Sequence, residues 1–179
     1  MDPHLRYHLR LSNAELAAEL ARLRVNWVTA YRSDRPVPSP PPTILLAALA
    51  SSDEARLRLT LIPLCLARPE YAHAVVEAAG VVPEDAWVTL ACYYSAAVSL
   101  QQKYGDRLDQ LGLKHDALPD QFARALDLPI AGDPDARLRL LAKRQGDLSG
   151  RSLNWYGTYE HAAERYIRRA QLELAWAAN

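Results

Sequence analysis

The chain has 179 residues, which is enough for one compact domain and too few for two of ordinary size. Half of the residues are hydrophobic and 23% are charged, as in a folded globular protein rather than a disordered one. Twenty-one lysines and arginines balance twenty-one aspartates and glutamates, so the chain lacks the basic excess of a dedicated nucleic-acid-binding protein. Two cysteines, Cys65 and Cys92, are too few for a disulfide framework or a four-thiolate zinc site.

Neither export nor membrane insertion is expected. Residues 1–11 contain no apolar core and no small-residue cleavage site, so they do not predict a signal peptide. The longest uncharged stretch, residues 86–102, is shorter than the roughly 20 residues of a membrane span and is polar in its second half. We therefore expect a cytoplasmic protein with reduced cysteines. No phosphate-binding loop, nucleophile motif or metal-ligand cluster occurs in the sequence, so no cofactor and no metal is expected.

The first predicted element is an amphipathic helix. Ser12 and Glu15 have the spacing of a capping box, in which each side chain accepts a hydrogen bond from the other residue's backbone amide. Apolar residues then recur at helical spacing, at Leu16, Leu20, Leu23, Trp27 and Tyr31. This pattern predicts a helix of about five turns. Residues 1–11 before it are expected to form a separate extended arm.

A proline-rich connector follows at residues 35–43. Five of its nine residues are proline, which fixes the backbone φ angle and removes amide donors, so a polyproline II conformation is expected. Such a segment is either a ligand for a proline-binding groove or a stiff spacer, and we favour the spacer. The connector is not a domain boundary, and residues 12–179 are predicted to form a single domain.

The rest of the chain predicts further helices. In chain order they lie at residues 43–50, 55–68, 69–79, 84–104, 119–126, 135–144 and 154–177. Ser51 to Glu54 form a second candidate capping box, and Pro63 is expected to kink or break the helix that follows. Gly80 is expected to end the third of these helices, and residues 146–150 to form a loop. These elements predict an all-α fold, a single-domain bundle of about seven to eight helices.

Two features could carry chemistry in the middle of the chain. Cys65 and Cys92 have no cationic neighbour in sequence to lower the thiol pKa, so both are expected to be buried and structural. Arg68 and His73 are separated by four residues, a spacing similar to the Arg-x4-6-His signature of the helical HEPN ribonucleases. That resemblance implies RNA cleavage at a dimer interface, although Pro69 stands where that family carries a polar residue. A capping arginine and a surface histidine are the favoured interpretation.

The most distinctive segment lies near the C-terminus. It combines aromatic and basic residues at Arg151, Trp155, Tyr159, Arg165 and Arg169. Aromatic rings with interleaved arginines can stack on bases and neutralise phosphates. The same residue types also anchor protein interfaces. A third interpretation, which we favour, is that the aromatic rings pack into the core while the arginines are solvated.

A resemblance to known proteins covers most of the chain from Leu11. Residues 47–72, the pair Leu128-Pro129 and the helix start Asn154-Trp155-Tyr156 are similar to small uncharacterised all-helical bacterial proteins. Those proteins accompany minimal nucleotidyltransferases, in the manner of toxin–antitoxin modules. The resemblance implies a non-catalytic helical partner of a nucleotidyltransferase. It transfers no functional residue, because that group has no motif to match position by position.

The sequence therefore favours an interaction protein over an enzyme. Its expected partner is another protein or a second copy of the chain, and such a function predicts an exposed apolar or aromatic patch. The alternatives are a HEPN-like metal-independent ribonuclease using Arg68 and His73, and a helical subunit of a nucleic-acid-binding complex using residues 151–169.

Overall fold

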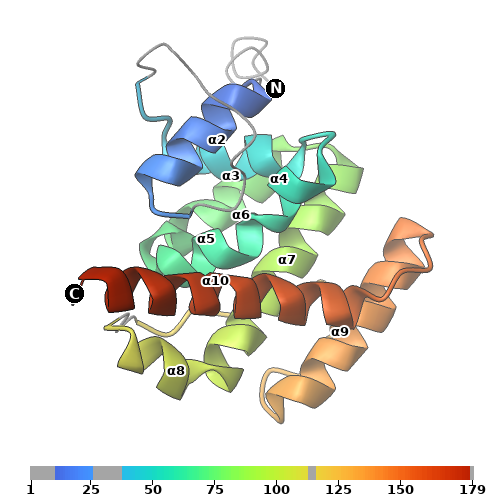
Figure 1. Cartoon of the computed structure of the whole chain (residues 1–179). Coiled ribbons are helices and arrows are strands. Elements are labelled where there is room, and N and C mark those ends of the chain that lie inside the picture. Colours follow the sequence, from blue (N-terminus) through green and yellow to red (C-terminus); the bar gives the residue numbers. More distant parts are fainter. Residues whose placement is uncertain (1–10, 26–37, 113–115, 178–179) are drawn as a thin grey trace.

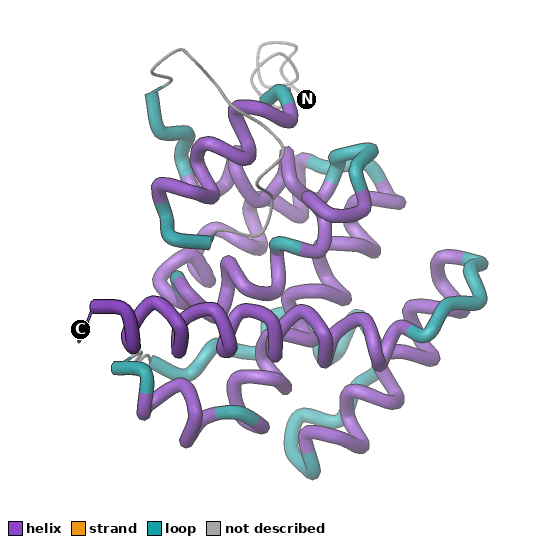
Figure 2. Tube along the Cα trace, in the orientation of Figure 1, coloured by secondary structure: helices purple, strands orange, loops and turns teal. Residues whose placement is uncertain are grey.

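A computed structural model describes residues 11–25, 38–112 and 116–177, and every regular element in them is a helix (Figure 1 and Figure 2). The predicted all-α fold is confirmed. The helices are α2 (Asn13–Arg22), α3 (Pro42–Ala50), α4 (Ala55–Leu59), α5 (Leu61–Ala67), α6 (Ala72–Val81), α7 (Glu84–Lys103), α8 (Gly105–Gln110), α9 (Pro134–Ser149) and α10 (Trp155–Ala177), with a 3₁₀ turn at Pro69–Tyr71. The predicted arm lies almost entirely outside the described residues.

Helix α7 is the centre of the bundle. It packs against α3, α5, α9 and α10, and all residues from Leu90 to Leu100 are buried. A helix that is buried on every side needs no polar face, which explains why residues 86–102 carry no charge. None of the described helices is long and apolar enough to cross a membrane.

Helix α10 crosses the front of the bundle in Figure 1, from α9 on the right to the C-terminus on the left. Its first half contributes Tyr159, Ala163 and Ile167 to the core, and it packs against α5, α7 and α9. Its last three turns are largely exposed. This helix therefore joins the core to a surface at the C-terminal end of the chain.

The N-terminal helix begins as predicted and ends earlier than predicted. The Ser12 Oγ accepts from the Glu15 amide at 3.2 Å, and the Glu15 carboxylate accepts from the Ser12 amide at 2.7 Å, so the capping box is confirmed. Helix α2 ends at Arg22, and Arg24 has a left-handed φ of 61° that reverses the chain. Trp27 and Tyr31, which the periodicity placed in the same helix, lie outside the described residues.

The predicted helix 55–68 is divided at Thr60 into α4 and α5. Pro63 is the physical cause, because its ring has no amide to donate to the Leu59 carbonyl and clashes with that carbonyl group. The predicted second capping box is wrong. Helix α4 has no side-chain cap, and the Ser52 Oγ instead accepts from the Glu54 amide at 3.2 Å.

Three other boundaries differ from the prediction. Helix α6 passes Gly80 and ends at Val81, because Val82 precedes Pro83 and takes the extended backbone that proline favours in its neighbour. The predicted helix at 119–126 is a series of turns instead. Helix α9 continues through the predicted loop at 146–150 and ends at Gly150, whose φ is 63°. The packing of the buried Gln145 side chain contributes more stability to the helix than the low helix propensity of Gly146 costs.

A buried ion pair holds the segment 116–133 against α9. The Arg137 side chain is 3% exposed and donates to the Asp120 carboxylate, whose other oxygen accepts from the Ala123 amide at 3.1 Å. The bond between Arg137 and Asp120 therefore ties this irregular segment to α9. The Tyr94 hydroxyl adds a second link, donating to the Pro119 carbonyl at 2.8 Å.

Replacing Asp120 by asparagine keeps the side-chain shape but leaves the Arg137 charge buried and uncompensated. We expect Asp120→Asn to lower the free energy of unfolding in urea by about 3 kcal/mol. Adding Arg137→Met should restore part of that loss, because the stranded charge is removed. A double variant whose loss equals the sum of the two single losses would contradict this account.

Candidate functional site

The structure separates the aromatic residues of the C-terminal segment from its arginines. Tyr159 has no exposed surface and donates its hydroxyl proton to the Gln145 side chain. Trp155 is 8% exposed, and its indole N–H donates to the Arg151 carbonyl at 3.3 Å. Both rings are therefore core residues rather than exposed anchors. Arg151, Arg165 and Arg169 are exposed, so the segment is divided between the core and two separate surfaces.

Arg68 and His73 do not form a shared site in the structure. The Arg68 guanidinium lies 3.6 Å from the Glu70 carboxylate, and both side chains are more than one third exposed. His73 is exposed, and its Nδ1 contacts the Glu70 backbone carbonyl. Neither residue lines either of the two cavities described below. The ribonuclease alternative therefore gains no support from the geometry.

An open groove of about 590 Å³ lies beside the C-terminal half of α10, and we call it the α10 groove. The ends of α2 and α8 form its other walls. Its apolar lining comes from Val25, Pro63, Leu111, Leu172 and Leu174, among others. The groove therefore offers an apolar surface that no described residue covers.

Arginine dominates the charge of the α10 groove. Its charged lining residues are Arg24, Arg165, Arg168, Arg169 and Glu173. Four cations against one carboxylate give this lining a net charge of +3, in a chain whose total formal charge is zero. Arg169 and Glu173 form an ion pair at 2.9 Å on the exposed side of the helix. The lining residues thus combine an apolar floor with a basic rim.

Large apolar side chains are exposed beside this groove. Leu172 and Leu174 are 48% and 49% exposed, and Trp176 is 74% exposed. Three such residues in the last two turns of one helix are more than the scattered single exposures of an ordinary surface. The end of α10 therefore has the composition of a protein-binding surface, in which a central tryptophan is a typical anchor.

A second cavity of about 520 Å³, which we call the polar pocket, lies at the opposite end of α10. Its buried end is formed by Tyr93 and Gln145. Four charged residues also line it, namely Asp53, Arg58, Asp85 and Arg151. The polar pocket is therefore electrically balanced, in contrast to the α10 groove.

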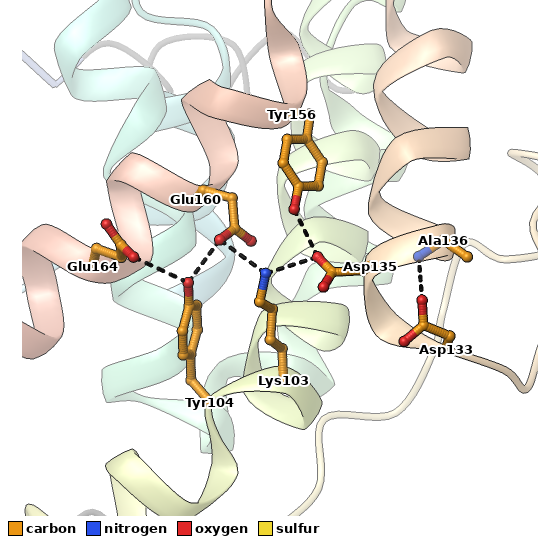
Figure 3. A network of polar contacts seen from close by, with 8 residues as sticks. All are labelled: Lys103, Tyr104, Asp133, Asp135, Ala136, Tyr156, Glu160 and Glu164. Carbon is orange, nitrogen blue, oxygen red and sulfur yellow. Dashed lines mark hydrogen bonds and ion pairs between the residues drawn. The ribbon is translucent and has the colours of Figure 1, made fainter.

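A network of polar contacts joins the end of α7 to α9 and α10 (Figure 3). The Lys103 ammonium donates to Asp135 at 2.7 Å and to Glu160 at 3.0 Å. The Tyr104 hydroxyl donates to Glu160 at 2.7 Å, and the Tyr156 hydroxyl donates to Asp135 at 2.7 Å. Every carboxylate in this network accepts from α7 or from a tyrosine, so its geometry is that of a structural clamp.

Lys103 and Asp135 hold each other in the ionised form. Burial lowers the pKa of Lys103, but hydrogen bonds to Asp135 and Glu160 outweigh that effect and raise it above its ordinary value. The hydrogen bonds from Lys103 and Tyr156 lower the pKa of Asp135. Lys103 is therefore a fixed cation at neutral pH and a poor nucleophile, which argues against a catalytic role.

No group of three or more metal-ligating side chains occurs within residues 11–25, 38–112 and 116–177. Burial raises the pKa of both thiols, Cys65 and Cys92, to about 12, as the sequence predicted for structural cysteines.

Comparison with protein-family models, with curated proteins and with solved structures gives no match. The interpretation of both cavities therefore depends on their own residues.

The sequence carries a signal for the α10 groove in the spacing of apolar residues along the last helix, which the prediction of core packing did not use. The apolar stripe of the last helix continues from Tyr166 through Ala170 to Leu174, past the end of the core. Leu172 and Trp176 lie off that stripe, on the other side of the helix. Arg24, by contrast, joins the groove through tertiary packing that no local pattern reveals.

The depressed pKa of Asp135 predicts a dependence of stability on acid. The ionised carboxylate of Asp135 contributes its full stabilisation of the folded state above its ordinary pKa of 3.8. That contribution is lost as the pH falls from there through the lower pKa of the folded state. Asp135→Asn should therefore flatten the fall of the melting temperature between about pH 5 and pH 2. Asp147→Asn, at an exposed α9 residue, is the matched control. Parallel pH profiles for the wild type and Asp135→Asn would contradict the role of this carboxylate.

The buried thiols predict chemical inertness. Neither Cys65 nor Cys92 should react with iodoacetamide at pH 8 while the protein is folded, and both should react in urea. Intact mass measurement distinguishes zero, one and two additions. Modification of the folded chain within minutes would show that a thiol is accessible and would contradict the packing described here.

Proposed function

We propose that this chain is a non-catalytic interaction protein whose α10 groove binds an acidic, amphipathic segment of a partner protein. The exposure of Leu172 and Leu174 in an arginine-lined groove, with Trp176 exposed in the same last two turns of α10, is the observation that carries this proposal. Burying one such side chain contributes about 1.5 to 3 kcal/mol, so three of them supply a substantial part of a stable interface.

Charge identifies the chemistry of the partner. A lining of four arginines and one glutamate is complementary to aspartate and glutamate side chains. Two copies of the groove facing each other would bring like charges together, which disfavours a symmetric dimer through this surface. The sequence segments 1–10 and 26–37 each contain two arginines and one aspartate, so they also lack the acidic character that the groove favours.

A nucleic acid is the less favoured ligand. Arginines in the lining would serve for phosphate contacts, but Leu172 and Leu174 provide exposed apolar surface that a phosphate backbone does not use. An amphipathic helix with an apolar face bordered by acidic residues satisfies both parts of the groove. The nucleotidyltransferase implied by the resemblance is the first partner to test.

The experiment compares affinity purifications from the native host with tagged wild-type chain and with the Leu172→Glu/Trp176→Glu variant. We expect one protein to purify with the wild type in stoichiometric amount and to be lost with the variant. The recovered partner should then bind the purified chain directly, with a dissociation constant that weakens at high salt because the arginine contacts are screened.

Leu153→Glu provides the matched control. Leu153 is 59% exposed, but it precedes the first turn of α10, about 18 Å along the helix axis from Arg165, where the groove begins. A partner that is retained by Leu172→Glu/Trp176→Glu, or released equally by Leu153→Glu, would refute the groove as the binding site. Recovery of RNA or DNA in place of protein, lost with Arg165→Gln/Arg168→Gln, would favour the nucleic-acid alternative.

A further inference from the structure

The polar pocket contains acidic and basic side chains that form no ion pair with one another. Arg58 and Arg151 line the same cavity as Asp53 and Asp85, yet no ion pair joins any two of them among the described residues. Arg58 donates to the Ser52 carbonyl at 2.6 Å, and Asp85 accepts from the Ala86 amide at 2.9 Å, so these two side chains are held in place. A ligand in the cavity can therefore contact both acidic and basic side chains.

The buried end of the pocket is built to donate hydrogen bonds. Tyr93 is 6% exposed and Gln145 is 2% exposed, and the Gln145 carbonyl oxygen is already occupied by the Tyr159 hydroxyl. Burial raises the pKa of Tyr93, while Arg58, a hydrogen bond with Gln145 and Arg151 act in the opposite direction, which places both guanidinium groups within electrostatic reach of the phenol. This end of the cavity is suited to a carboxylate.

The carboxylates of the pocket make it unsuitable for a strongly anionic ligand. Asp85, Thr89 and Tyr93 follow one another at intervals of four residues on α7, so they share one face of that helix. Asp85 at the exposed start of this row lies about 12 Å along the helix axis from Tyr93. A ligand that follows this row meets carboxylate at one end and donors at the other.

We propose that the polar pocket binds a short peptide of three or four residues with free ends, because an extended chain needs that length to span about 12 Å. Its carboxylate contacts Tyr93 and Arg151, and its ammonium group contacts the aspartates. The volume of about 520 Å³ lies within the range of small-molecule sites. The inference uses residues that the α10 groove does not contain, so it stands independently of the proposed protein partner.

The test is isothermal titration calorimetry of the full chain with trialanine, tetraalanine and triglycine, followed by N-acetyl and C-amide forms of any probe that binds. We expect at least one zwitterion to bind and each capped form to lose about tenfold or more in affinity, because each cap removes one charge-assisted contact. Absence of binding by every probe would overturn the proposal. An N-acetyl form that binds as well as its parent would also overturn it, because it would leave only an anion site.

Variants assign the binding to this pocket. Arg151→Gln and Asp53→Asn change exposed residues, and each should weaken the bound zwitterion about tenfold while leaving the circular dichroism spectrum unchanged. Arg168→Gln, in the α10 groove, is the matched control and should have no effect. Equal weakening by Arg168→Gln, or none by Arg151→Gln, would place the ligand elsewhere and refute the assignment.

Discussion

The burial of α7 from Leu90 to Leu100 determines how the rest of this structure is arranged. A helix with no charge from Ala86 to Gln102 is stable in water only if other helices cover all of its sides, since each Å² of exposed apolar surface costs about 25 cal/mol. Helices α3 and α5 provide this cover from the N-terminal part of the chain, and α9 and α10 provide it from the C-terminal part. The chain must therefore return to α7 from both directions, which places α10 across the bundle.

Both candidate sites lie where this cover ends. The polar pocket is found at the N-terminal end of α7, where Asp85 and Thr89 begin the row that leads to Tyr93. The α10 groove forms where α10 extends past the core. The contacts of Lys103 with Asp135 and Glu160 hold the end of α7 against the two C-terminal helices.

Sequence reasoning recovered the elements whose causes are local. The Ser12–Glu15 capping box, the start of α7 after Pro83 and the buried cysteines all depend on a few neighbouring residues. It was wrong where tertiary contacts override local preference, as in the extension of α9 past Gly146 and the irregular segment 119–126 that Arg137 holds. The two cavities could not be predicted, because residues far apart in sequence, such as Arg24 and Leu174, meet only after folding.

Native-state hydrogen exchange measured along the whole chain tests the central claim most directly. If α7 is the element on which the fold depends, its amides from Leu90 to Leu100 should exchange only through global unfolding, with a free energy equal to that from urea denaturation. The last turns of α10 should exchange through local opening of much lower free energy. Exchange of the α7 amides at the same low free energy as the end of α10 would contradict the account.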